Sequence, residues 1–303
     1  MKQDTQQRKL SWRRDDIERR LAFPGERYLK VGAFSSGSLA LVATLLFYSA
    51  VFIAPDCAAK ATFLERGFIP YPIVFLGFWT FALLWFKTRK IKLQRKPLQL
   101  PILPDDPDFI LTVATVDDAM RKISENAESP KDFLLYRRVV QTLAHLRNLG
   151  QVAEVDALFR SQAERDENLS ETSYALINGF LWAIPILGFI GTVLGLSSAI
   201  ASFTGVLTAS GEISELTPAL KQVTSGLSTA FETTFLALSV ALALQIFATF
   251  VRKSEEELLD DISDFCAANV VLKLRVDGRD FVPPAFVKRA ATFPPTLDER
   301  RFR

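Results

Sequence analysis

Apolar residues fall into four long blocks along the chain. Each block is bounded by charged residues and contains no charge, apart from Glu232 in the last; the blocks comprise residues 31–55, 67–86, 172–211 and 222–251. About 20 residues of helix cross the roughly 30 Å hydrocarbon layer of a bilayer. A buried helix of a soluble protein seldom stays apolar on every face over that length. The pattern therefore predicts an all-α, polytopic membrane protein with four transmembrane helices.

Amphipathic patterns outside the blocks predict further helices. Apolar residues recur at helical spacing over 133–149 and again over 152–176, which runs into the third span without a breaker. Another amphipathic helix is expected over 255–265, after the fourth span. Residues 10–23 mix apolar residues with four arginines and predict a short helix lying at the membrane surface. Long helices should therefore project from the membrane on one side.

Basic residues are distributed asymmetrically about the blocks, although the net charge is only +2. Of the 36 Lys and Arg residues, the loops at 55–67 and 204–225 hold only Lys60, Arg66 and Lys221. The positive-inside rule therefore places both termini and the central segment in the cytoplasm. Six basic residues after the second span fit a topological stop signal beside anionic lipid headgroups better than a nucleic-acid site. They are Lys87, Arg89, Lys90, Lys92, Arg95 and Lys96.

These patterns divide the chain into five parts. They are an N-terminal cytoplasmic segment with an interfacial helix (1–31), spans one and two (32–88), a cytoplasmic helical segment (89–177), spans three and four (178–251), and a cytoplasmic helix with an irregular tail (252–303). The first two spans are rich in aromatic residues, which indicates lipid contact and a scaffold role.

Small and hydroxyl residues form one stripe along the third span, consisting of Gly188, Thr192, Gly195, Ala199 and Ser202. Such residues let helix backbones approach closely in lipid, and Gly191 and Gly195 form a GxxxG pair. Pro185 leaves one backbone carbonyl without its helical donor and should loosen the helix there. We therefore assign Pro185, Gly188, Gly191 and Gly195 to helix packing and gating. Two interpretations of the stripe remain open: plain packing, or packing combined with an ion pathway.

The fourth span carries a second small stripe, formed by Ala230, Thr234, Ala237 and Ala241. Glu232 is the one ionisable residue inside the spans, and a carboxylate in a membrane should face protein or water. It lies about 200° around the helix from Thr234, away from the stripe. Glu232 is therefore a candidate for a subunit contact or a pathway, as are its neighbours Thr229 and Thr233. Alternatively, it reaches water at the outer interface.

The sequence offers no recognisable catalytic chemistry. It contains no GxxxxGK[ST] phosphate loop, no HExxH and no GxSxG, which argues against a nucleotide-driven pump or a hydrolase. The single histidine, His145, falls in a helix pattern and is expected on its surface, so no metal site is predicted. Cys57 and Cys266 should lie on opposite sides of the membrane and cannot pair. We expect neither an enzyme nor a cofactor.

The last two spans resemble the MotA/TolQ/ExbB proton-channel family. The resemblance rests on AIPILGFIGTVLGL in span three, VTSGLSTAFETTFLALSVAL in span four and the charged helix RKSEEELLDDISDF after it. It covers about residues 174–266, and the four-span layout is similar to the flagellar-stator type. Two positions depart from the family: its frequent Ala-Ile-Pro is Leu242-Ala243-Leu244 here, and the acidic position of some members is Thr229.

The resemblance implies a function. Thr192 and Thr234 match the family's pore threonines, which line the ion pathway, and Pro185 matches its proline at the start of the polar span. The multi-span subunits of this family form a homo-oligomeric ring, typically a pentamer, in the bacterial inner membrane. The ring surrounds a single-span partner of the MotB/TolR/ExbD type, which carries the proton-accepting Asp. The alternatives are a membrane scaffold or receptor-like protein without ion conduction and, less favoured, a substrate-carrying transporter.

Overall fold

The computed structural model describes residues 9–20, 28–55, 60–102, 115–149, 152–208 and 213–273. Helices make up the secondary structure of these residues, together with one isolated bridge between Leu10 and Ala127 and no strand. The predicted all-α class is confirmed. Cys57 and the tail from residue 274 lie outside the described residues.

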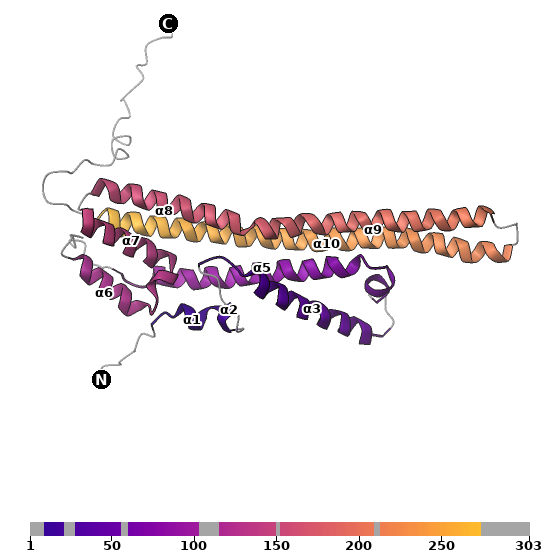
Figure 1. Ribbon diagram of the computed structural model, residues 1–303, viewed down its shortest axis with the longest axis horizontal. Helices are drawn as coiled ribbons and strands as arrows, with labels where there is room; N and C mark the ends of the chain where they lie inside the picture. The colour runs from indigo at the N-terminus through magenta and orange to yellow at the C-terminus, as the bar shows by residue number, and fades with distance from the viewer. Residues whose placement is uncertain are drawn as a thin grey trace, which may run out of the picture.

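Two long antiparallel helices lie side by side, and one of them runs nearly the length of the molecule (Figure 1). They are α9 (Ala175–Thr208) and α10 (Ile213–Cys266), and α8 (Val152–Ser173) continues the line of α9. The predicted uninterrupted rod from 152 into span three is therefore broken once, at the turn formed by Tyr174. At 1.5 Å per residue, α10 is roughly 80 Å long, far more than the roughly 30 Å hydrocarbon layer. The helix predicted over 255–265 is the end of α10 itself.

Two shorter helices lie along one side of this pair: α3 (Ala33–Ile53) and α5 (Pro70–Arg95). α3 falls within the first predicted block (31–55), whereas α5 runs on to Arg95, beyond the second block, which ends at residue 86. Trp79 of α5 donates a hydrogen bond from its Nε1 to the Ser36 hydroxyl of α3 at 3.1 Å, and Gly77 of α5 faces Val240 of α10. With the two long rods, α3 and α5 give the described part of the chain four helices that are long and apolar enough to cross a membrane.

The remaining helices gather at one end of the molecule, which we call the base (Figure 1). They are α1 (Trp12–Asp15), α2 (Ile17–Arg20), α6 (Val116–Asn126) and α7 (Leu134–Leu149), with the short turns η2 (Lys96–Gln99) and η3 (Pro130–Asp132). The short helix η1 (Ala61–Glu65) precedes α5, and η4 (Ala267–Val271) continues from the end of α10. The structure divides the predicted surface helix at Asp16 into α1 and α2. Trp12 is buried, and its ring lies edge-on against Phe133 at 5.7 Å.

Buried ion pairs join α5 to α10 and to α2. Lys87 pairs with Glu255 at 2.6 Å and Lys90 pairs with Glu18 at 2.6 Å, and all four side chains are at most 1% exposed. Contact with headgroups is therefore wrong for these two lysines, which point into protein, and it stays a prediction for the rest of the basic cluster. Charges buried to this degree are stable only when they are paired and hydrogen-bonded.

Glu255 lies at the centre of the largest of these networks. Its carboxylate accepts hydrogen bonds from the Ser170 hydroxyl at 2.6 Å and the Tyr174 hydroxyl at 2.8 Å, besides the pair with Lys87. The Lys87 ammonium also lies 4.1 Å from the centre of the Tyr174 ring. This network joins α5, α8 and α10 where α8 meets α9, and it fixes the two rods in register.

Candidate functional site

The two long helices approach most closely where glycine faces glycine or alanine. A Cβ atom on Gly195 would lie 2.7 Å from the backbone oxygen of Gly226 and 2.7 Å from the nitrogen of Ala230. A Cβ on Gly226 would lie 2.8 Å from the oxygen of Gly195. Backbone atoms cannot move aside as a flexible side chain can, so both positions require glycine at this helix separation. Gly226 was not singled out from the sequence, because a single glycine in span four carries no spacing signal.

Gly188 and Gly191 continue the same interface toward the base. Gly188 faces Ala237, and a Cβ there would approach the Ala237 methyl to 2.5 Å. Gly191 faces Thr233, which is 1% exposed and donates to the carbonyl of Thr229 in its own helix at 2.8 Å. The predicted small stripes of the two spans therefore pack against each other.

Thr192 and Thr234 meet across this interface, and their hydroxyl groups hydrogen-bond to each other. Each hydroxyl also lies near two backbone carbonyls: Thr192 Oγ1 is 3.2 Å from Ala230 O and 3.3 Å from Gly188 O, and Thr234 Oγ1 is 3.0 Å from Gly188 O and 3.2 Å from Ala230 O. Two protons are thus shared among several acceptors. Because a hydroxyl both donates and accepts, the pair can exchange hydrogen-bond partners without leaving its place.

The threonine pair lies on the side of the interface away from α5. A Cβ on Gly191, one residue before Thr192, would lie 3.2 Å from Ile69, the residue that precedes α5. One residue corresponds to about 100° of helix rotation, so Thr192 turns away from α5 and toward the free face of the pair. Both threonines are half-buried, and the residues around them on that face, including Phe189 and Leu238, are exposed in the single chain. A further helix could therefore reach the hydroxyls from this face.

Glu232 lies on another side of α10 and is fully engaged within its own chain. Arg66 donates to both carboxylate oxygens, from Nε at 2.9 Å and from Nη2 at 2.7 Å. Thr62 donates at 3.1 Å and Ser228 at 2.6 Å. The carboxylate therefore fastens the segment before α5 to α10. Arg66 entered the sequence argument only as a loop charge, since its distance of 166 residues from Glu232 gave no local signal.

The other predicted site residues have simpler surroundings. Thr229 is half-buried and donates to the carbonyl of Ser225 at 2.9 Å, one turn back in its own helix. Pro185 lies inside α9, which continues through it. Contact of Glu232, Thr229 or Thr233 with another subunit stays a prediction.

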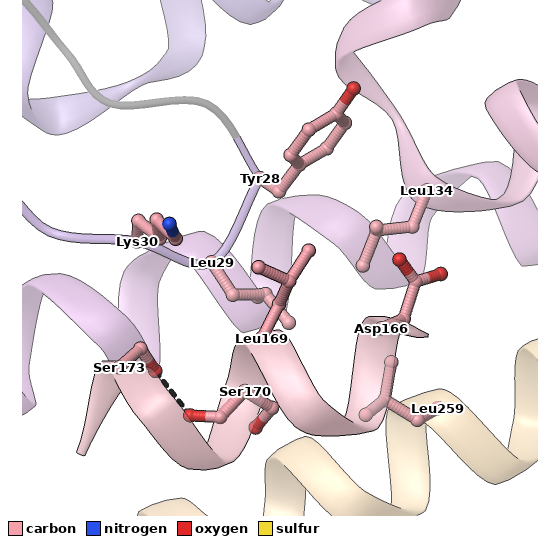
Figure 2. A pocket seen from close by; sticks show the side chains of 9 residues that line it. All are labelled: Tyr28, Leu29, Lys30, Leu134, Asp166, Leu169, Ser170, Ser173 and Leu259. Carbon is pink, nitrogen blue, oxygen red and sulfur yellow. Dashed lines mark hydrogen bonds between the residues drawn. The ribbon is translucent and has the colours of Figure 1, made fainter. Parts of the chain in front are cut away.

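The described residues hold no cluster of three or more His, Cys, Asp or Glu side chains that could bind a metal ion. A cavity of about 30 Å³ lies in the base, between the chain at Tyr28–Lys30 and helices α7, α8 and α10 (Figure 2). Asp166 and Ser170 from α8 line it, and its volume suits one or two water molecules but no metabolite. The threonine pair is therefore the strongest candidate for function.

Residues 126–264 match the model of the MotA/TolQ/ExbB proton channel family. The match begins in the base and covers α7, α8, the whole of α9 and α10 as far as Asp264. It confirms the resemblance inferred from the two polar spans. Neither the curated proteins nor the solved structures contain a match to the chain.

Proposed function

From the family match over residues 126–264, we propose that this chain is a ring-forming subunit of an energy-transducing channel or motor driven by ion, most simply proton, motive force. Thr192 and Thr234 line the ion path, and a single-span partner supplies the carboxylate that carries the proton. The paired hydroxyls of these two threonines, half-buried and facing away from the scaffold helix α5, carry the proposal.

The polar residues of the spans support a function that is shared between two chains, with the proton-carrying acid on the second chain. The one carboxylate within the spanning part of α10, Glu232, is held by Arg66 and two hydroxyl donors, so it is not available to pick up and release a proton. Hydroxyl groups can pass a proton along but do not store one near neutral pH. An acid from another chain is therefore needed beside the threonine pair.

Exposed apolar side chains support assembly around such a partner. Trp182 and Phe189 on α9 are 75% and 65% exposed, and Phe235 on α10 is 75% exposed. Large apolar side chains thus lie exposed on both long helices, where neighbouring copies of the chain can cover them. We propose a homo-oligomeric ring, with five copies as the expected number, in a bacterial inner membrane with the base and both termini in the cytoplasm.

A membrane scaffold without ion conduction is the competing function. Purification of the full chain in mild detergent, followed by native mass spectrometry, separates the two. A ring of several copies that retains a small single-span protein with an intramembrane Asp supports the proposal. A monomer without such a protein contradicts it.

Proton uptake measures the function directly. Vesicles containing the purified complex should take up protons when a potassium diffusion potential, negative inside, is imposed. Uptake should exceed that of empty vesicles and be lost when the partner's Asp is replaced by Asn.

A further inference from the structure

A second set of polar groups lies on the same free face as the threonine pair, closer to the base. Gln245 of α10 and Asn178 of α9 are both exposed in the single chain. Gln245 follows Thr234 by 11 residues, which is three turns and about 20° of rotation, and Asn178 precedes Thr192 by 14 residues, about 40° from the same line. The two amides therefore lie on the threonine face, Gln245 about 16 Å from Thr234 along α10 and Asn178 about 21 Å from Thr192 along α9.

The register of the two helices brings these amides to one level. Gly195 faces Ala230 and Gly188 faces Ala237, so residue numbers across the interface sum to 425. Continued toward the base, this register places Leu181 opposite Leu244, the residue before Gln245. Asn178 then lies opposite residue 247, two residues or about 3 Å from the level of Gln245.

Pro185 leaves a backbone carbonyl without a hydrogen-bond donor at the same level of the helix pair. Proline has no N–H, so the carbonyl of Leu181, four residues earlier in α9, receives no helical hydrogen bond. In a membrane such a carbonyl needs water or a side chain as its donor. The primary amides of Asn178 and Gln245 each offer two N–H donors and one acceptor, and the described residues show no side-chain partner for either amide.

The row of residues on the threonine face of α10 continues from the level of Gln245 to a charged side chain. Arg252 follows Thr234 by 18 residues, five turns of helix, and therefore lies on the same face about 27 Å away. Its guanidinium is 5.3 Å from the centre of the Tyr174 ring and 3.8 Å from the Glu256 carboxylate. An exposed ion pair belongs to water, so the stretch from Thr234 to Arg252 corresponds to nearly the full hydrocarbon thickness.

We propose that Asn178, Gln245 and the free carbonyl of Leu181 form a hydrated inner site, through which the ion passes from the threonine pair to the cytoplasm. This inference rests on the proposed function for the identity of the ion. Two uncharged amides facing lipid at this depth would be costly, whereas facing a water-filled path they are satisfied. They lie between the hydroxyl pair and Arg252, where the face offers few other polar groups.

Thiol accessibility tests the inner site without requiring ion flow. In the full chain with Cys57→Ser and Cys266→Ala, Gln245→Cys and Asn178→Cys are exposed to a membrane-impermeant methanethiosulfonate carrying a quaternary ammonium group, in inverted vesicles. The matched control is Ala243→Cys, which is also exposed in the single chain but lies two residues and about 200° away on α10.

Gln245→Cys and Asn178→Cys should react at least about tenfold faster than Ala243→Cys. An apolar environment raises the pKa of a thiol, and each pKa unit lowers the concentration of the reactive thiolate about tenfold. Equal rates would overturn the inner site, whether or not the wild-type protein conducts. Fast labelling in a protein that takes up no protons would keep the hydrated site and reject the proposed function.

The role of the site in transport needs a second measurement. Gln245→Leu should lower proton uptake strongly, while Gln245→Asn, which retains the amide, should preserve most of it. Unchanged uptake in Gln245→Leu would show that the amide is no part of the path, even if position 245 is wet.

Discussion

The hydroxyl of Thr192 on α9 hydrogen-bonds to the hydroxyl of Thr234 on α10, between two turns where glycine permits close contact. Gly188 lies one turn from Thr192 on the same helix, and its carbonyl accepts from Thr234 at 3.0 Å. Tight packing and polar groups therefore occupy the same few residues, so the packing role is observed and the ion pathway stays a prediction. The interface packs, and the hydroxyl pair lies at the edge of the packed zone that faces away from α5.

Replacing either threonine by valine should abolish coupling while leaving assembly intact. Thr192→Val or Thr234→Val keeps the side-chain shape and removes one hydroxyl, and the loss of a neutral hydrogen bond costs only about 1 kcal/mol. We expect the oligomer to form at normal yield and proton uptake in vesicles to fall to the level of empty vesicles.

Thr44→Val serves as the control for these variants. Thr44 lies in α3 and donates to the carbonyl of Ala40 in its own helix at 2.8 Å, so it tests the loss of a membrane hydroxyl far from the pair. Uptake should stay normal in Thr44→Val. Normal uptake in both Thr192→Val and Thr234→Val would remove the threonines from the pathway.

Adding one methyl group at Gly195 should separate the long helices. The new Cβ of Gly195→Ala would meet backbone atoms of α10 at 2.7 Å, and overpacking of this kind costs about 1–3 kcal/mol. Gly179→Ala in the same helix is the matched control, since a Cβ there meets nothing within 4 Å. It should be neutral or slightly stabilising because alanine favours helix.

The Cys266 thiol reports this change. Burial raises its pKa to about 12, so the reactive thiolate is scarce at pH 8 as long as the base stays folded. In a Cys57→Ser background, the temperature at which a maleimide dye labels Cys266 should drop in Gly195→Ala and stay unchanged in Gly179→Ala. Equal labelling temperatures would mean that the helices can part at little cost.

Neutralising Glu232 should loosen the segment before α5 without stopping ion flow. Glu232→Gln leaves Arg66 without its carboxylate, and the loss of a charge-assisted pair, reduced by partial exposure of 19% and 33%, should cost about 1–2 kcal/mol. Arg66→Lys retains the positive charge but cannot contact both carboxylate oxygens in the way that arginine does. It should therefore lose part of this stabilising free energy.

A double-mutant cycle isolates the pair. Arg66→Met and Glu232→Gln should each lower the unfolding temperature in detergent, and the double variant should lose less than the sum of the two. Strict additivity would show that the two side chains do not stabilise each other. Loss of proton uptake in Glu232→Gln with normal stability would instead return Glu232 to the ion path.

Breaking the buried pair between α5 and α10 should have the largest effect on stability. Glu255→Gln leaves the Lys87 ammonium, which is 1% exposed, without a counter-charge, and removing one partner of such a pair costs about 3–5 kcal/mol. The double variant Lys87→Met, Glu255→Gln holds no unpaired charge and should be more stable than Glu255→Gln alone, as measured by denaturation in detergent. If the double variant were the less stable of the two, buried charge would not be the cause.

The sequence by itself determined the fold class and the location of the candidate site. Uncharged blocks long enough to cross a bilayer leave helices as the simplest solution, because lipid offers no hydrogen bonds to the backbone. α3 begins and ends close to the predicted bounds for that reason, whereas α5 continues nine residues past its block. The small stripes likewise identified Gly188, Gly195, Ala230 and Ala237 as contact residues, since spacing at three and four residues is a local property of one helix.

Only the tertiary structure decided which polar groups meet. The partners of Glu232 and Glu255, Arg66 and Lys87, lie 166 and 168 residues away in the chain. No periodicity connects them, and a lysine at a membrane boundary has the same sequence pattern whether it faces headgroups or a buried carboxylate. The pairing of Thr192 with Thr234, and the common face that they share with Asn178 and Gln245, depend on the antiparallel register of α9 and α10. Close backbone contact between facing small residues sets that register, and no single helix contains it.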